Sequence, residues 1–268
     1  MAGYKYYQHG LIYSGAPHTE NKLSRSECKE LLQKNHNAWF IRNIYDFDCD
    51  EQTSFWFVVQ DKPLTMENLH SKCRNQVRRA QKTLDLQIVE RQAFLNMGGY
   101  KCYIESFKRY KVKSSVPLNE KQFTEHILKM QPSAELWAAV EKVSGKMVAY
   151  AEVLCQSNCA KYTALKGIPE YLNKCYPFYG LLFEMNRYYI EEQQFLYVTD
   201  GARSVSEHSN IQSFLDKFNF RRAYCRLNVT YVWWLRIIVA IIYPFRKILG
   251  HGKLSYLLRF EAINRNEY

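Results

Sequence analysis

Polar side chains that can carry chemistry gather just after an apolar, strand-like segment, residues 195–199. Asp200, Arg203, Glu207 and His208 follow it closely. Ligand sites of open sheets lie at the carboxyl ends of strands. His208 titrates near neutral pH and can accept a proton, whereas Arg203 can hold a phosphate or carboxylate with two hydrogen bonds. We therefore predict Asp200 and His208 as catalytic residues and Arg203 as a ligand-binding residue.

A purely structural interpretation of the same turn is also open. Asp200 can pair with Arg203 and fix the loop, while Ser209 and Gln212 form a capping box for the helix that follows. Glu152 is a further candidate base, inside an apolar strand-like stretch. An isolated carboxylate there points either outward or into a cleft, and strand alternation alone does not decide between them.

The segment 66–84 has helical spacing, with apolar residues on one face and cations opposite. The apolar positions are Leu69, Cys73, Val77, Ala80 and Leu84, and the cations are Lys72, Arg74, Arg78, Arg79 and Lys82. Such a run is either a solvated helix face or a site for polyphosphate, anionic lipid or a tRNA backbone. The sequence contains no stacking motif of the common RNA-binding modules.

The most hydrophobic stretch covers residues 232–244 and includes Trp233 and Trp234. A membrane-spanning helix needs ~20 apolar residues, and this stretch is shorter, interrupted by Arg236 and ended by Pro244. One interpretation is a segment lying in the headgroup region of an anionic membrane. The other is a helix packed on the domain or in a homodimer interface.

The remaining pattern predicts the elements that position these residues. Strands are expected at 53–60, 85–90, 161–168, 195–199 and 221–231, with a hairpin formed by 135–142 and 147–154. Helices are expected at 66–84, 100–110, 120–130, 177–192 and 210–218, and short helices with loops over 1–50. This order suits an α/β or α+β layer, a mixed sheet covered by helices.

Composition and charge narrow the classes of protein further. The 268 residues are 47% hydrophobic with only 11 Gly and 7 Pro, which excludes disorder as the main state. The net charge of +11 favours partners that carry phosphate. The eight cysteines lack zinc-site spacing, and no signal peptide is evident, so reduced thiols and a cytoplasmic location are expected. No dinucleotide, P-loop, zincin or nucleophile-elbow motif occurs.

Three segments, 71–82, 196–204 and 210–220, resemble the GNAT acyltransferase superfamily, in particular its FemAB-like branch. The resemblance implies an N-terminal extension (1–54), an acyltransferase domain (55–231) with a mixed, mostly antiparallel sheet, and an apolar, basic helical tail (232–268). It also implies transfer of an acyl or aminoacyl group from acyl-CoA, such as acetyl-CoA, or from aminoacyl-tRNA to an amine acceptor, without a metal. Lys174, Tyr179, Gly180 and Asn210 then join Arg203 as cofactor-binding residues.

Two departures from the GNAT pattern bear on these expectations. Leu215 stands where many GNAT enzymes have a tyrosine that protonates the departing thiolate, and the segment before the long helix has one glycine, Gly180. Orientation of the reactants still supplies much of the rate in such transfers. The alternative is a catalytically silent protein that docks on an anionic membrane, at the inner face of the cell membrane, or on an envelope-assembly partner.

Overall fold

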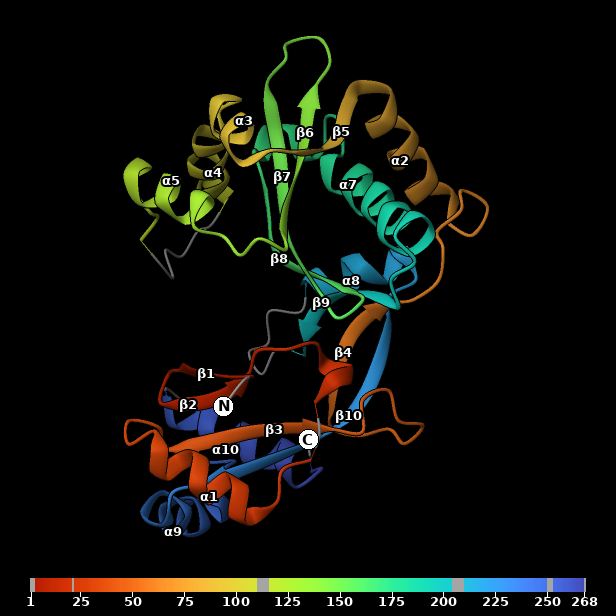
Figure 1. The fold of residues 1–268 in the computed structure, drawn as a ribbon. Coiled ribbons are helices and arrows are strands. Elements are labelled where there is room, and N and C mark those ends of the chain that lie inside the picture. Colours follow the sequence, from red (N-terminus) through yellow and green to blue (C-terminus); the bar gives the residue numbers. More distant parts are fainter. Residues whose placement is uncertain (1–2, 21, 110–115, 204–209, 250–252, 268) are drawn as a thin grey trace. The chain divides into compact units, whose positions relative to one another are not determined.

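The computed structural model describes residues 3–20, 22–109, 116–203, 210–249 and 253–267 (Figure 1). The chain divides into two compact units. Unit 1 comprises Met1–Val58, Gly201–Gln212 and Arg221–Tyr268, and unit 2 comprises Val59–Asp200 and Ser213–Phe220. Unit 1 thus combines the predicted N-terminal segment with the predicted C-terminal tail.

The described residues form ten strands and ten α-helices. The strands are β1 (Tyr4–Tyr7), β2 (Gly10–Tyr13), β3 (Phe40–Tyr45), β4 (Phe55–Gln60), β5 (Leu84–Val89), β6 (Ala134–Glu141), β7 (Met147–Gln156), β8 (Cys159–Gly167), β9 (Tyr197–Ala202) and β10 (Arg221–Tyr231). The helices are α1 (Arg25–Lys34), α2 (Ser71–Thr83), α3 (Arg91–Asn96), α4 (Gly99–Ser106), α5 (Glu120–Leu128), α6 (Pro169–Leu172), α7 (Pro177–Asn186), α8 (Asn210–Leu215), α9 (Trp233–Ile242) and α10 (Lys253–Asn264).

Unit 2 is built on five strands in the order β9-β8-β7-β6-β5. The pairs from β5 to β8 are antiparallel, and β8 runs parallel to β9. Helices α3, α4 and α5 cover one face of this sheet, and α2 and α7 lie on the other (Figure 1). The predicted fold class, a mixed and mostly antiparallel sheet flanked by helices with an apolar helical extension at the C-terminus, is confirmed.

Strand alternation decides which side chains each face of the unit 2 sheet receives. Leu136, Ala138 and Val140 of β6 pack under α3–α5 in a core that also contains Phe94 and Phe123. Trp137, between them in sequence, faces the other way and donates a hydrogen bond from Nε1 to Tyr189 Oη at 2.9 Å. The five apolar positions predicted for the 66–84 helix are all buried, although α2 itself begins only at Ser71.

Unit 1 contains a second group of paired strands, in the order β1-β2-β3-β10. β2 and β3 are parallel, whereas the other two pairs are antiparallel. The expectation of short helices and loops over residues 1–50 is therefore wrong for three strands. Their alternation is hidden because polar residues are buried in β3: Asn43 is fully buried and accepts a hydrogen bond from the Leu23 N–H at 2.7 Å.

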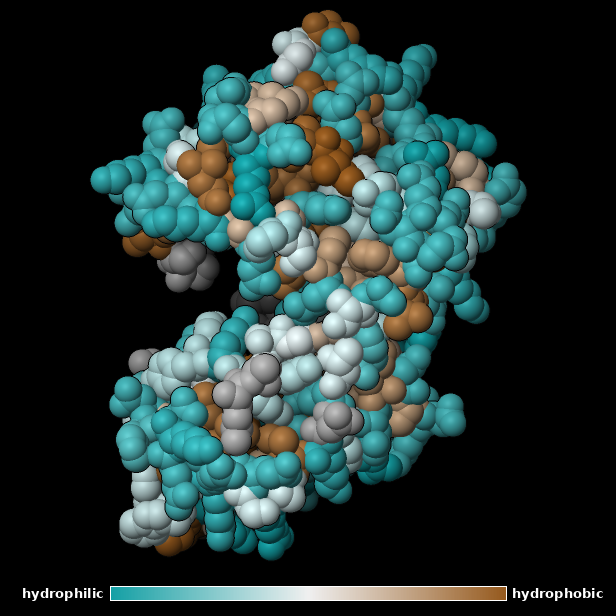
Figure 2. Space-filling model, viewed as in Figure 1, coloured by the Kyte–Doolittle hydropathy of each residue, from teal (hydrophilic) through white to brown (hydrophobic). Residues whose placement is uncertain are grey.

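The apolar C-terminal stretch forms α9, as its composition predicts. Among the described helices, α9 included, none combines the length and the apolar character needed to cross a membrane. Figure 2 shows that most of the visible surface is hydrophilic, with hydrophobic side chains gathered in places, for example over β5 and β6.

Candidate functional site

Glu152 points into the space between the unit 2 sheet and the helices that cover its α3–α5 face. It lies in β7 opposite Leu136 of β6 and Ala164 of β8, and Leu136 belongs to the core under α3–α5. Because directly opposed residues share a face, Glu152 faces α3–α5 as well. It is 8% exposed. Of the two orientations that the sequence leaves open, the structure has the inward one.

His126 of α5 lies directly beside this carboxylate. Its Nε2 is 3.3 Å from Glu152 Oε2, and its side chain is 47% exposed against 11% for Glu152. The imidazole thus lies between solvent and a buried carboxylate. A capping box formed by Asn119 and Gln122 fixes the start of α5, and buried Phe123 and Ile127 attach the helix to the core. His126 was not among the residues predicted from the sequence.

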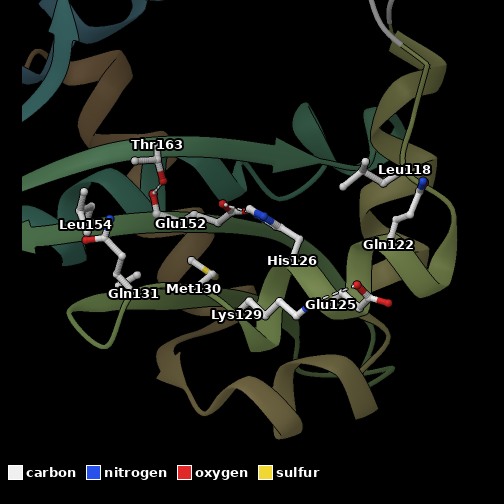
Figure 3. A pocket seen from close by; sticks show the side chains of 11 residues that line it. Leu118, Gln122, Glu125, His126, Lys129, Met130, Gln131, Glu152, Leu154 and Thr163 are labelled. Carbon is white, nitrogen blue, oxygen red and sulfur yellow. Dashed lines mark hydrogen bonds and ion pairs between the residues drawn. The ribbon is translucent and has the colours of Figure 1, made fainter. Parts of the chain in front are cut away.

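The pair opens onto a cavity of about 640 Å³ within unit 2 (Figure 3). The lining residues are Leu118, Gln122, Glu125, His126, Lys129, Met130, Gln131, Ala134, Glu152, Leu154 and Thr163. Thr163 belongs to β8 at a point where the register with β7 shifts, and its hydroxyl donates a hydrogen bond to the Glu152 carbonyl at 3.0 Å. Such bulges re-aim side chains beside functional sites. Here the bulge aims a hydroxyl into the cavity.

This arrangement suits general base catalysis. The Nε2 of His126 faces the carboxylate, which holds the proton on that nitrogen and leaves Nδ1 as the proton acceptor. A histidine oriented by a carboxylate can take a proton from a bound nucleophile near neutral pH.

Asp200 lies on the opposite face of the same sheet. The β8–β9 ladder has three pairs and ends at Lys161–Thr199, although both strands continue. Asp200 and Tyr162 come one residue beyond that last pair. Tyr162 is opposed to Val153, whose neighbour Glu152 faces the cavity, so alternation directs Tyr162 and Asp200 away from it. The structure therefore does not bring Glu152 and Asp200 together.

A partly buried carboxyl group, that of Asp200, and the buried Tyr162 lie where the β8–β9 ladder ends. Burial raises the pKa of Asp200 to about 6. Burial, and after it the charge of Asp200, raise the pKa of Tyr162. The Tyr162 hydroxyl is buried and has no hydrogen-bond partner among the described residues. A hydroxyl in that state gains most from a ligand that accepts its proton in a hydrogen bond.

Three predicted cofactor-binding residues lie near the start of α7. Lys174 Nζ is 2.9 Å from Glu141 Oε1, and this hydrogen bond raises the pKa of Lys174. Tyr179 Oη accepts a hydrogen bond from Lys217 Nζ at 3.4 Å. A Cβ added to Gly180 would lie 2.8 Å from Ala80 Cβ, so this glycine permits close packing of α7 on α2.

The basic helix α2 contributes to the surroundings of α7. The Arg79 guanidinium lies 5.8 Å from the centre of the Tyr176 ring, and Tyr176 precedes α7 with a φ of 52°. Arg79 and Lys217 are both exposed. With Lys174 they place three cations around the start of an α-helix, whose N–H groups also favour anions. The sequence predicted Arg79 as one of the basic residues of the 66–84 helix that could bind polyphosphate, but not its position beside the start of α7.

The other predicted residues lie in unit 1 or outside the described residues. Arg203 Nη1 donates a hydrogen bond to the Ser54 carbonyl at 2.8 Å, and the guanidinium lies 4.1 Å from the centre of the Trp56 ring. Together with Arg222, 4.5 Å from that ring, it borders a cavity of about 420 Å³. Asn210 begins α8. His208 lies outside the described residues, and within those residues no cluster of three metal-ligating side chains occurs.

Comparisons with known proteins concern the fold alone. No protein-family model matches the sequence, and no curated protein matches it significantly. Among solved structures, L-PGS from Bacillus licheniformis is similar with a TM-score of 0.54 and 12% identity, over 98% of this chain and 85% of that one. The C-terminal domain of a protein named as a lysylphosphatidylglycerol synthetase from Agrobacterium fabrum gives 0.52 and 10%, over 84% and 78%.

FemX is also similar, with a TM-score of 0.50 and 11% identity, over 76% of this chain and 68% of that one. These three structures agree with the resemblance that the sequence segments suggested. At such low identity the agreement concerns architecture and not substrates. The chain therefore has the GNAT-like fold that FemX and the lysylphosphatidylglycerol synthetase domains also have.

Proposed function

We propose that this protein is an N-acyltransferase that moves an acyl or aminoacyl group onto an amine acceptor. The observation that carries the proposal is the His126–Glu152 pair, at 3.3 Å, at the cavity on the α3–α5 face. A carboxylate-oriented histidine beside an open cavity is what deprotonation of an amine requires. The GNAT-like fold supports the acyl-transfer class.

The donor approaches from the other face. Acyl-CoA carries a pyrophosphate, and the cations around the start of α7, Arg79 and Lys217 foremost, suit that group. Acetyl-CoA is the simplest donor of this kind. Aminoacyl-tRNA is the second candidate donor, since the exposed cations of α2 also suit a nucleic-acid backbone.

The end of the β8–β9 ladder connects the two faces in this proposal. Beyond Lys161 and Thr199 the strands no longer pair with each other, so their backbone groups there can bind the thin acyl arm of a donor. The reacting carbonyl then meets an amine held in the cavity. Holding both reactants at bonding distance supplies a large part of the rate.

The transfer step balances with the side chains present. The amine nitrogen attacks the thioester carbonyl, the C–N bond forms, and His126 Nδ1 takes one proton from that nitrogen. The C–S bond then breaks and the thiolate takes a proton from solvent, while His126 returns the proton that it accepted to solvent, so the products are the amide and the thiol. Tyr162, whose hydroxyl has no partner among the described residues, donates a hydrogen bond to the leaving sulfur. Asp200 lies beside Tyr162 on the same, leaving-group face of the sheet. Leu215, where a tyrosine was expected, is 1% exposed and packs in the core.

The proposed location is the cytoplasm, with peripheral attachment to the inner face of the cell membrane. Helix α9 exposes an apolar surface suited to such attachment, and this surface does not involve the cavity. A protein that only binds, without transfer, would need neither the His126–Glu152 pair nor a donor site. Turnover therefore separates the two functions.

The test measures thiol release from acetyl-CoA with a panel of primary amines: amino sugars, lysine and a peptide with a free amine. We expect amine-dependent release by the intact chain and a loss of at least 100-fold in His126→Ala. Lys121→Gln is the matched control, because Lys121 is an exposed residue of the same helix, α5, and does not line the cavity. Calorimetry with acetyl-CoA, and filter binding with aminoacyl-tRNA, identify the donor. Absence of binding to both donors contradicts the proposal.

A further inference from the structure

Helix α9 and the residues after it expose an unusual amount of apolar surface. Trp233 is 74% exposed, Ile241 63% and Ile248 82%. The α9 surface consists of the exposed residues Trp233, Trp234, Ile237, Ile238, Ile241, Phe245 and Ile248. Large apolar side chains that gather in one patch mark an interaction site rather than ordinary surface variation.

The buried face of α9 is a different one. Leu235 and Val239 are buried, and Tyr243 packs with Leu258 and Ala262 of α10. At 100° per residue these positions lie on the side of the helix opposite Ile237 and Ile241. The buried side chains therefore attach α9 to unit 1, and the α9 surface takes no part in that packing.

Aromatic rings extend the α9 surface beyond the helix. The Trp39 ring lies 5.6 Å from that of Trp234 in an edge-on arrangement, and Trp39 is itself exposed. His9 stacks on Trp39 with 4.0 Å between ring centres. Rings that are apolar with one polar tip favour the boundary between a membrane and water.

The charged residues around the α9 surface are mostly basic, although Arg246 is paired with Glu267 at 2.9 Å. From Val232 to Phe260 the sequence contains five Arg or Lys residues and no Asp or Glu. Arg236 is exposed at the border of the apolar face, and Lys247 is exposed between Phe245 and Ile248. Exposed cations at the rim of an apolar face complement anionic headgroups above acyl chains.

We propose that the α9 surface binds an anionic phospholipid bilayer, with α9 lying in the plane of the headgroups. A helix of ten residues is too short to span a bilayer but long enough to lie in its interface. A second copy of the chain suits this surface less well. Two-fold pairing would place the cations of one copy close to the same cations of the other, and like charges repel. The proposal is independent of the transfer reaction.

Vesicle flotation of the intact chain tests the proposal. Vesicles of phosphatidylcholine alone are compared with vesicles that contain phosphatidylglycerol, at low and high salt. We expect binding to the anionic vesicles, weak binding to neutral ones, and a severalfold loss as salt rises. Binding to neither kind of vesicle, or equal and salt-independent binding to both, overturns the proposal.

Variants of exposed residues locate the interaction. Ile237→Glu with Ile241→Glu should reduce vesicle binding at least tenfold without changing the melting temperature, because both side chains are exposed. Val143→Glu is the matched control, since Val143 is 97% exposed in the β6–β7 turn and should have no effect. Unchanged binding in the double variant contradicts the proposal.

Two further measurements separate the competing explanations. Analytical ultracentrifugation without vesicles detects a dimer, and a dimer abolished by the double variant assigns the α9 surface to a second copy instead. Thiol release with a water-soluble amine should be unchanged in the double variant. If the double variant loses both transfer and vesicle binding, the α9 surface is needed for the reaction, and membrane binding is not independent of transfer.

Discussion

Each face of the unit 2 sheet carries a carboxyl group, and the surroundings of the two groups differ. On the α3–α5 face, Glu152 has an imidazole at 3.3 Å and an adjoining cavity. On the other face, burial raises the pKa of Asp200 to about 6, beside a tyrosine hydroxyl without a partner among the described residues. The first arrangement is suited to accepting a proton and the second to receiving a ligand. In the proposed transfer, the acceptor amine would bind on the first face and the leaving group on the second.

The largest expected effect comes from Glu152→Gln. The amide keeps the shape of the side chain but no longer holds a proton on His126 Nε2 by charge, so turnover should fall by about 100-fold or more. The melting temperature should change little, because His126 is partly exposed. Steady-state kinetics of thiol release, with Lys121→Gln as the control outside the cavity, checks this. Turnover within threefold of the wild type means that the pair does not act as the base.

Asp200→Asn should change the pH dependence of stability. The ordinary pKa of this carboxyl is 3.8 and its folded value is about 6. Between those values the folded chain keeps a proton that the unfolded chain releases, so this group lowers the free energy of unfolding as pH rises. The variant should therefore gain on the order of 2 kcal/mol relative to wild type from pH 4 to pH 7.

Urea denaturation at several pH values measures that gain. The quantity compared is the difference between the two chains at each pH, which removes the contribution of the other titrating groups. The test uses only how this difference in the free energy of unfolding changes with pH, and not its size at any one pH. A difference that stays constant from pH 4 to pH 7 shows that Asp200 is not buried in this way.

Tyr162→Phe separates function from stability most cleanly. Because the Tyr162 hydroxyl has no partner among the described residues, its removal leaves no group unsatisfied and should keep or slightly raise the melting temperature. Turnover should fall about tenfold, equal to ~1.4 kcal/mol, if the hydroxyl assists the leaving thiolate. Calorimetry and thiol-release kinetics on the same preparation give both values. A stability loss with normal turnover assigns the hydroxyl a structural role.

The spacing of apolar residues predicted those elements of unit 2 that follow a single helical or strand period. The buried positions Cys73, Val77 and Ala80 follow a helical period, so the helix predicted over 66–84 is confirmed for Ser71–Thr83, whereas Leu69 precedes it and Leu84 begins β5. The 135–154 hairpin follows a period of two and is confirmed. Strand β3 was not predicted because Asn43, near its centre, is buried through hydrogen bonds rather than through hydrophobicity. Local pattern does not report burial of that kind.

The sequence identified Glu152 of the candidate site but not the residue that pairs with it. Glu152 was selected as an isolated charge in an apolar strand. Its orientation depends on the register with Leu136, and its partner His126 comes from α5, 26 residues earlier. On α5 alone, His126 has the polar neighbours typical of a solvated helix face. Only the packing of α5 on the sheet reveals that it faces a carboxylate.

Lys174→Ala should have the smallest effect on the donor side. Lys174 is largely exposed and paired with Glu141, so its loss should leave the melting temperature nearly unchanged. Its charge is already compensated, and the Kd for acetyl-CoA should rise only about twofold. Arg79, whose guanidinium stacks on Tyr176 beside the start of α7, should matter more, with a Kd about tenfold higher in Arg79→Ala. Calorimetry at two salt concentrations checks both values. The reverse order would assign the phosphate to Lys174, and the donor site would then lie nearer to Glu141 than to α2.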